Sequence, residues 1–142
     1  MDRKQRVAEL AAEKLFDSDQ ASQMLGMTIV SVAPGSARVT MRVRPDMVNG
    51  HDICHGGLIF ALADSAFAFA CNSHGHNTVA AGAAIEFLAP GRKGDLLTAS
   101  ATERWRAGRS GIYEIEVRNE RGDAIALFRG RSHQVAGRLV DE

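Results

Sequence analysis

The chain has 142 residues, and its 17 Lys and Arg residues balance its 17 Asp and Glu residues to a formal net charge of zero. This length suits one domain around a single hydrophobic core, here spanning residues 1–142. A neutral chain lacks the overall positive field that binds nucleic acids and anionic membranes, so neither is an expected partner. Any anionic ligand would have to bind at a local basic patch.

The amino-terminal residues do not resemble a secretory signal, because Met1–Arg6 is charged and leads into an amphipathic segment. The longest apolar run, residues 57–71, contains Asp64 and is shorter than the roughly 20 residues that a bilayer requires. A cytoplasmic protein is therefore expected. In that compartment Cys54 and Cys71 are expected to remain thiols rather than form a disulfide.

Residues 1–25 are predicted to form a helical arm. Apolar side chains within residues 2–15 recur at helical spacing, namely Val7, Leu10, Ala11 and Leu15. Asp17, Ser18 and Asp19 follow as candidate caps. A short second helical turn should therefore end near Gly26.

A β-hairpin is predicted next, because two β-branched stretches, 27–32 and 37–43, flank the turn signal Pro34-Gly35. Residues 46–57 are rich in glycine and contain Asn-Gly, which favours an irregular loop. Residues 57–72 are apolar on nearly every side and rich in Ala and Leu. That composition predicts a helix enclosed by other structure.

Four further strands are predicted at residues 78–88, 95–106, 111–119 and 124–135, with turn signals between them. A helix that is apolar all round needs a curved sheet, since a flat layer would cover only one side. The expected fold is therefore α+β of the hotdog kind, with about six antiparallel strands around one long buried helix. Its free sheet edges favour dimerisation.

Asp64 is the most informative residue, because an ionised carboxylate within an apolar helix is costly unless it is paired, solvated or functional. One reading is structural: the carboxylate bonds to backbone at a helix crossing or at a dimer interface. The other is catalytic, and a perturbed buried acid in a cleft is typical of such sites. The residues alone leave both open.

The loop Asn49–Gly57 runs directly into the buried helix, so its last backbone N–H groups lie at the positive end of the helix dipole. Such an end can stabilise a developing oxyanion, and Gly56 and Gly57 would let a carbonyl approach the backbone closely. Asn49 and His55 would add donors or fix the loop. Taken singly, each glycine is explained by a turn and each histidine by an ordinary loop contact.

Gly57 and Asp64 are seven residues apart, which places them on one helix face but about 10 Å apart along the axis. One thioester does not easily touch both. Two antiparallel helices from two protomers would instead bring one subunit's loop to the other subunit's Asp64. The spacing thus predicts a site shared across a dimer.

Metal and nucleophile chemistry are weaker alternatives. The soft ligands form no paired C-x-x-C pattern, so no metal and no cofactor are expected; they are His51, Cys54, His55, Cys71, His74 and His76. The chain has no Gly-x-Ser-x-Gly elbow and no phosphate loop of the Walker type. Cys54 beside His55 is a poor case for a thiol nucleophile.

Basic residues gather at predicted strand ends, where a nucleotide phosphate would be held unless they are simply solvated. They are Arg92 and Lys93, Arg104, Arg106 and Arg109, and Arg129 and Arg131. Of these, Arg92, Lys93 and Arg109 are predicted substrate-binding residues. Aromatic residues of the buried helix, Phe60 and Phe67, would line an aryl pocket or pack in the core.

Four segments together resemble the phenylacetate-degradation (PaaI-type) thioesterases over nearly the whole chain after the first twenty residues. They are Asn49–Gly57, Ala61–Asp64, Phe87–Gly91 and Leu127–His133. The specific feature is His55-Gly56-Gly57 with Asn six residues before the histidine and Asp nine after it. A His-Gly-Gly string alone would be weak.

The resemblance implies hydrolysis of phenylacetyl or hydroxyphenylacetyl coenzyme A by a dimer of hotdog dimers. Asn49 and the Gly56 N–H would polarise the thioester carbonyl, and His55 and Gly57 would help to position it. Asp64 would activate water or attack directly. Some relatives carry a strand hydroxyl that holds the water; Ala80-Ala81-Gly82 offers none, and Thr78 is the nearest.

Two other functions remain open at this point. A hotdog dehydratase or hydratase would also use an acid–base residue near a helix end, although its usual His-led pair is not evident. A non-catalytic acyl-CoA sensor would keep the pocket without turnover, since fold does not determine function.

Overall fold

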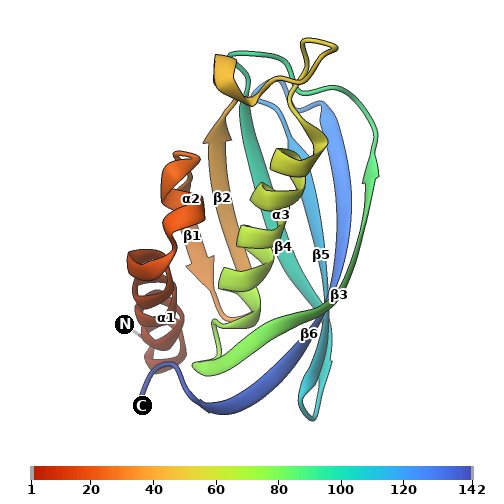
Figure 1. Cartoon of the computed structure of the whole chain (residues 1–142). Helices are drawn as coiled ribbons and strands as arrows, with labels where there is room; N and C mark the ends of the chain where they lie inside the picture. The colour runs from red at the N-terminus through yellow and green to blue at the C-terminus, as the bar shows by residue number, and fades with distance from the viewer. Residues whose placement is uncertain (1, 142) are drawn as a thin grey trace.

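The structure, a computed structural model, describes residues 2–141 and begins with the helical arm. Helix α1 spans Arg3–Ser18 and α2 spans Gln20–Met24. Asp2 and Asp19 cap them, because each side chain accepts a hydrogen bond from a backbone N–H of the following turn. The arm lies beside β1 (Figure 1), and Phe16 packs against Phe69 of the long helix with ring centroids 6.3 Å apart.

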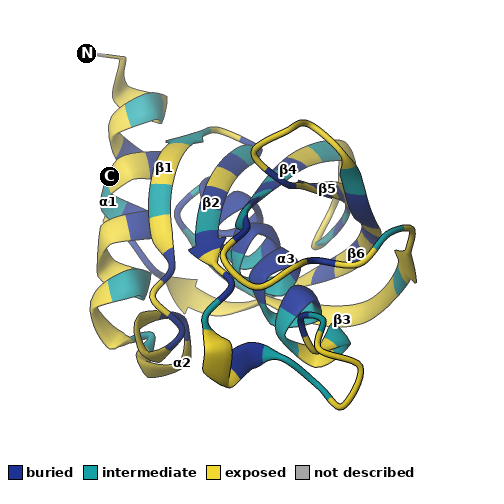
Figure 2. Cartoon of the chain, turned by 90° about the horizontal axis from the view of Figure 1, so that it is seen from above, coloured by how far each residue is buried: buried dark blue, intermediate teal, exposed yellow. Residues whose placement is uncertain are grey.

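Six antiparallel strands form one sheet in the order β1-β2-β4-β5-β6-β3. Their bounds are Thr28–Ala33 for β1, Ser36–Arg42 for β2, His76–Phe87 for β3, Leu96–Ala107 for β4, Ser110–Arg118 for β5 and Ala124–Arg138 for β6. Strands β1 and β3 are the two edges. The sheet curls around the long helix α3, Gly56–Cys71, which lies along its concave face (Figures 1 and 2).

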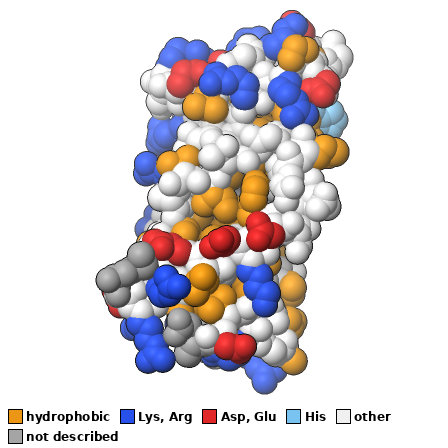
Figure 3. All heavy atoms as spheres, turned by 90° about the vertical axis from the view of Figure 1, so that its left-hand side faces the viewer, with side chains coloured by type: hydrophobic (Ala, Val, Ile, Leu, Met, Phe, Trp, Pro, Cys, Tyr) orange, Lys and Arg blue, Asp and Glu red, His pale blue; other side chains and the backbone are white. Residues whose placement is uncertain are grey.

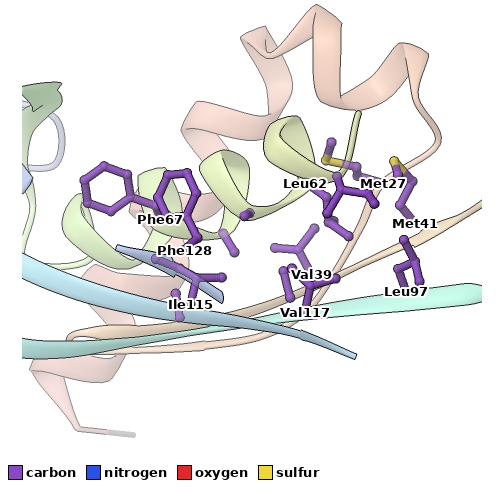
Figure 4. Packing of buried hydrophobic residues seen from close by; sticks show 14 of the residues in the cluster. Met27, Val39, Met41, Leu62, Phe67, Leu97, Ile115, Val117 and Phe128 are labelled. Atoms are coloured by element: carbon purple, nitrogen blue, oxygen red, sulfur yellow. The ribbon is translucent and has the colours of Figure 1, made fainter. Parts of the chain in front are cut away.

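The core lies between α3 and the sheet, and Figure 4 shows Leu62 and Phe67 of the helix facing side chains of the strands. Leu62, Val39 and Val117 are completely buried. Burial of this apolar surface, at about 25 cal/mol per Å², is the main favourable term that holds the helix on the sheet. The position of every residue on α3 follows from this contact.

The predicted elements are confirmed, with small shifts at their ends. The irregular loop prediction for residues 46–57 was incomplete, because Pro45–Met47 forms a short 3-10 helix and α3 begins at Gly56. Pro45 favours that turn, since its fixed φ suits the first helical position. Among the described residues, no helix combines the length and apolarity needed to cross a membrane.

Helix α3 is less enclosed than its apolar sequence suggests. Leu62, Ala63 and Ala66 are fully buried, whereas Gly57 is exposed and Ala61, Asp64 and Ala68 are only partly covered. These last four recur at helical spacing and form one open stripe. Alanine and glycine suit either side of a helix, so the pattern did not reveal this face.

Gly130 of β6 is expected to be essential for packing under α3. A Cβ at this position would lie 2.7 Å from the Phe67 ring, which is itself held between Tyr113 and Phe128. Gly130→Ala should therefore destabilise the fold by about 1–3 kcal/mol, the usual cost of overpacking. Urea unfolding measures the change in the free energy of unfolding. The matched control is Gly50→Ala, whose new Cβ would meet nothing within 4 Å. Equal stability of the two variants would contradict the expectation.

Candidate functional site

Asp64 lies in a hollow of about 410 Å³ between α3, the arm and the start of β3. The hollow is lined by Leu15, Ser18 and Asp19 of the arm, by Asp64, Phe67, Ala68, Phe69, Cys71 and Asn72 of α3 and its end, and by Thr78, Val79 and Ala80 of β3. The carboxylate is half-buried, and it has no hydrogen-bond or ion-pair partner within residues 2–141. A structural reading that has it bonded to backbone of its own chain is therefore not supported.

The pKa of Asp64 is raised above its usual range. The larger cause is removal of water from the carboxylate by burial, and the second is the nearby negative charge of Asp19. Both favour the protonated form. An acid in this setting is closer to the pKa that suits proton transfer at neutral pH than an exposed aspartate is.

A chain of hydrogen bonds joins Asp19 to α3. The Ser22 hydroxyl donates to Asp19 Oδ2 at 2.6 Å, and Ser22 Oγ lies 2.8 Å from Ser65 Oγ. With its own proton given to Asp19, Ser22 must accept from Ser65. The arm is thus tied to the residue next to Asp64, and Asp19 is held on the wall of the hollow.

The loop residues lie at the other end of the open stripe. His55 is the N-cap of α3, and its Nδ1 accepts the Gly57 N–H at 3.0 Å. A neutral imidazole that accepts through Nδ1 carries its proton on Nε2. Gly57 therefore has no free N–H for a ligand, whereas the Gly56 N–H has no acceptor within residues 2–141.

Asn49 uses its side-chain oxygen to shape the loop. Oδ1 accepts backbone N–H groups from His51 at 2.9 Å and from Ile53 at 3.4 Å. The amide Nδ2 makes no bond within the described part of the chain, which leaves it available as a donor. The exposed ring of Phe87, at the end of β3, would lie 3.1 Å from a Cβ on Gly56, so it borders this loop.

In one protomer these two groups of residues do not meet. Asn49, His55, Gly56 and Gly57 are absent from the lining of the Asp64 hollow, which extends along α3 towards its carboxyl end. The separation of about 10 Å expected from helix geometry is thus present in the fold. A single chain places an acid and a potential oxyanion site on the same face without joining them.

The two aromatic candidates have different environments. Phe60 is half-buried and packs edge-on against Phe128, with centroids 5.1 Å apart. Phe67 is buried in the core, yet it also borders the Asp64 hollow. Phe67 is therefore a packing residue that offers part of its ring to the cavity.

The basic candidates separate to opposite ends of the molecule. Arg92 and Lys93 lie beside the His55 loop: the Arg92 backbone N–H donates to Asp95, and Lys93 Nζ is 3.7 Å from Asp52. Arg109 lies near the carboxyl end of α3, where it lines a small hollow with Cys71 and Thr78. Arg106 lines the same hollow, so within residues 2–141 Arg106 and Arg109 lie towards the Asp64 end of α3, whereas Arg92 and Lys93 lie at the other end.

The cysteines are separate buried thiols. Burial raises the pKa of Cys54 to about 11 and, with Asp64 nearby, that of Cys71 to about 12. Neither is a thiolate at neutral pH, which disfavours a Cys54–His55 nucleophile. Residues 2–141 contain no group of three His, Cys, Asp or Glu side chains arranged for a metal ion.

Ser18 and Asp19 are wall residues that sequence reasoning missed as site residues, because it recognised them only as helix caps. Thr78, considered for water binding, does line the hollow together with Ala80. The Thr78 hydroxyl donates to the His76 carbonyl at 2.9 Å, so its oxygen still has acceptor capacity. Hydroxyl groups of Ser18 and Thr78 therefore line the hollow that holds Asp64, even though residues 80–82 supply none.

The thioesterase superfamily model matches residues 51–126, which include the loop, α3 and the following strands. The chain belongs to the thioesterase superfamily. It is 46% identical to the acyl-coenzyme A thioesterase PaaI of Escherichia coli (strain K12), over 92% of this chain and 94% of that protein. These findings confirm the family inferred from the Asn49–Asp64 pattern.

Solved structures show the same fold and the same relationship to PaaI proteins. The E. coli PaaI protein from the phenylacetic acid degradation operon has a TM-score of 0.93 at 45% identity, covering 94% of this chain and 97% of that one. The TT0310 protein of Thermus thermophilus has a TM-score of 0.79 at 38% identity, covering 82% of this chain and 98% of that one. The hotdog fold is confirmed.

Asp19→Asn is expected to lower the pKa of Asp64. The substitution removes a negative charge that opposes ionisation, so the ionised form of Asp64 becomes easier to reach. Asparagine still caps α2, so the arm should stay folded. Titration of the Asp64 carboxyl carbon by NMR measures the change in its pKa. The control is Asp17→Asn, at an exposed position. An unchanged or raised Asp64 pKa in Asp19→Asn would refute the electrostatic coupling between the two carboxylates.

Proposed function

We propose that the protein is an acyl-CoA thioesterase that hydrolyses aryl-acetyl thioesters, phenylacetyl-CoA or hydroxyphenylacetyl-CoA, to the free acid and CoA. The observation that carries this proposal is the Asp64 carboxylate, which has no partner among residues 2–141, in its hollow on the open face of α3. The substrate class rests on the names of the E. coli relative and of its operon. The Phe67 ring at the hollow suits an aromatic acyl group.

Asp64 is proposed to act in one of two ways during hydrolysis, as a general base or as a nucleophile. As a general base it takes a proton from water, and the hydroxide adds to the thioester carbon; the C–S bond then breaks and the thiolate leaves as CoA. As a nucleophile it forms an acyl-aspartyl anhydride with release of CoA, and water hydrolyses that anhydride. In both routes the carbonyl oxygen becomes negative before the C–S bond breaks.

The Gly56 N–H at the start of α3 is the proposed donor to that oxygen. It is unpaired within the described residues and lies at the positive end of the helix dipole. Asn49 Nδ2 is the second proposed donor. The role proposed for His55 is indirect, because its bond to the Gly57 N–H fixes the first turn of α3.

The complete site is proposed to form between two chains. Strand β3 is a twelve-residue free edge with exposed Val79 and Phe87, and such an edge is a ready surface for pairing. Antiparallel pairing of two β3 strands about their centres puts the start of one beside the end of the other. The Asp64 hollow borders the start, at Thr78, and Gly56 borders the end, at Phe87.

Pairing through β3 would therefore bring each Asp64 close to the other chain's Gly56 loop. The small residues of the open stripe on α3, Gly57, Ala61 and Ala68, would let the second helix approach closely. Assembly of two such dimers into a tetramer remains a prediction from the resemblance to PaaI-type enzymes.

Asp64→Asn and Asp64→Ala are expected to reduce kcat for phenylacetyl-CoA by at least about 100-fold, since a positioned acid–base group typically contributes that much or more. Thiol release over a panel of acyl-CoA substrates is the measurement. Glu13→Gln, on an exposed position of α1, is the control for loss of a carboxylate. Full turnover in both Asp64 variants would exclude the proposed role.

The same assay separates the alternatives. An enoyl-CoA product from a β-hydroxyacyl-CoA would indicate a dehydratase. Tight CoA binding without thiol release from any substrate would indicate a sensor.

Ala81→Lys is expected to prevent dimer formation and thereby reduce activity. Ala81 falls in a register shift between β3 and β6 and is exposed on the edge, so a charged side chain there should disturb pairing with a second chain more than the fold itself. Light scattering measures mass and thiol release measures activity. Ser31→Lys on the opposite edge strand is the control, and a monomeric Ala81→Lys with full activity would show that the site is not shared.

A further inference from the structure

Asn49 is followed by a glycine, and this pair lies in the loop that leads into α3. The chain has three other asparagines, Asn72, Asn77 and Asn119, and none of them precedes a glycine. Asparagine is thermolabile, because its side-chain carbonyl carbon is open to attack by the backbone nitrogen of the next residue. Glycine hinders that attack least, since it has no Cβ and a flexible backbone. The sequence therefore marks Asn49 as the most reactive of the four amides.

The structure leaves the Gly50 backbone nitrogen free to act as the nucleophile. On either side of it the loop is closed, because the Asn49 N–H donates to the Ile53 carbonyl at 2.8 Å and the Asp52 N–H donates to the Asn49 carbonyl at 3.0 Å. The Gly50 N–H itself has no acceptor within residues 2–141. Gly50 is exposed, and a Cβ built on it would meet no atom within 4 Å. Solvent therefore reaches this residue.

The hydrogen bonds of the Asn49 side chain favour the same attack. Its Oδ1 accepts backbone N–H groups from His51 at 2.9 Å and from Ile53 at 3.4 Å. Negative charge develops on this oxygen when a nucleophile adds to Cγ, and backbone donors stabilise such charge as they do in an oxyanion hole. The Nδ2 atom, which would be the leaving group, makes no hydrogen bond within the described part of the chain.

Two of the other asparagines are held differently. Asn72 is buried, and its Nδ2 donates to the carbonyls of Ala68 at 2.9 Å and Thr78 at 3.0 Å. Asn119 is buried as well, and its Nδ2 donates to Asp123 Oδ2 at 3.1 Å. Departure of either amide nitrogen would break these bonds. The loop that carries Asn49, by contrast, lies at the end of the molecule opposite the chain termini (Figure 1), which exposes Lys, Arg, Asp and Glu side chains at the top of Figure 3.

We propose that Asn49 is a site of spontaneous deamidation. The Gly50 nitrogen gives its proton to water or hydroxide and forms a bond to Asn49 Cγ. The bond from Cγ to Nδ2 then breaks, and Nδ2 takes up a proton and leaves as ammonia, which gives a five-membered succinimide. Water opens this ring at Cγ to yield aspartate, or at the backbone carbonyl carbon to yield isoaspartate. Nothing is oxidised or reduced, and water is the only co-reactant.

Either product would remove the carbonyl donor proposed at Asn49, a consequence that rests on the proposed thioesterase function. Aspartate has no N–H to donate and is ionised at neutral pH. Its charge would oppose the negative charge that develops on the thioester oxygen. Isoaspartate lengthens the main chain by one carbon within the closed loop, so the bond between the Asn49 N–H and the Ile53 carbonyl would be disturbed. Deamidation would thus switch off hydrolysis as the protein ages.

Peptide mapping by mass spectrometry tests the modification itself. The full-length protein is incubated at mildly acidic and at mildly alkaline pH, and an isoaspartyl methyltransferase reports the isoaspartate fraction. Conversion at Asn49 should grow with time and should be faster at alkaline pH, because the attacking nitrogen must lose its proton. Asn72, Asn77 and Asn119 are internal controls. No conversion at Asn49, or equal conversion at Asn77, would overturn the proposal.

Two variants test the link to activity. Gly50→Ala keeps Asn49, and it should fold normally because Gly50 does not have a positive φ and a Cβ there has space. It should start with full thiol release, deamidate more slowly and keep its activity during the incubation. Asn49→Asp, which reproduces one product, should lower kcat about 100-fold or more, as removal of an oxyanion donor does. The unaltered protein should lose activity in proportion to the converted fraction.

The mass readout does not depend on turnover, so the two proposals fail separately. If the fresh protein hydrolyses no thioester, the proposed function fails, while conversion at Asn49 still supports the modification. If the fresh protein is active and Asn49 converts without loss of activity, the switch-off is overturned. Equal loss of activity in Gly50→Ala without conversion would also overturn it, because ageing would then act elsewhere.

Discussion

Helix α3 lies on the concave face of the sheet because Leu62, Ala63, Ala66 and Phe67 are buried there, and the rest of the molecule is arranged around that contact. Packing one side of the helix against the strands leaves the opposite stripe, including Asp64, outside the core. The carboxylate thus avoids full burial, which would be prohibitive without a partner. It still loses enough water to be a stronger base than an exposed aspartate.

The same contact keeps the proposed carbonyl-binding residues apart from the Asp64 carboxylate of the same chain. Residues that would bind a carbonyl oxygen are fixed at the first turn of α3, and the acid follows two turns later. Because a helix is rigid at this length, no local adjustment can bring Gly56 to its own chain's Asp64. A second chain paired along β3 resolves the separation without bending the helix, and this connects the exposed edge strand to the proposed activity.

Much of the fold could be predicted because its signals are local. Helical spacing indicated the arm, β-branched runs indicated the strands, and the motif from Asn49 to Asp64 indicated the family. The open face of α3 could not be predicted from the sequence, because Ala61 and Ala68 fit a buried or a partly covered position equally well. Pairing of β3 with β6 rather than with β4 is likewise a long-range choice.

The candidate site could also be predicted only in part, because some of its residues have local signals and others do not. Asp64, Gly56 and His55 stand out from the sequence, because an acid in an apolar helix and a Gly-Gly helix start are unusual locally. Ser18 and Asp19 are 45 or more residues from Asp64 in sequence, and only tertiary packing shows that they border it.

The hydrogen bond between Ser22 and Ser65 suggests that the arm opens before the sheet unfolds. Helix α2 has five residues, too few to be stable on its own. It is held by a small set of side-chain bonds, which include its Asp19 cap, the Ser22–Ser65 contact with α3 and the bond from Arg44 Nη1 to the Met24 carbonyl at 3.0 Å. Such units exchange their amide hydrogens through local opening well below the global unfolding free energy. Each opening removes Ser18 and Asp19 from the wall of the Asp64 hollow, so on warming the hollow should lose its shape while the sheet remains intact.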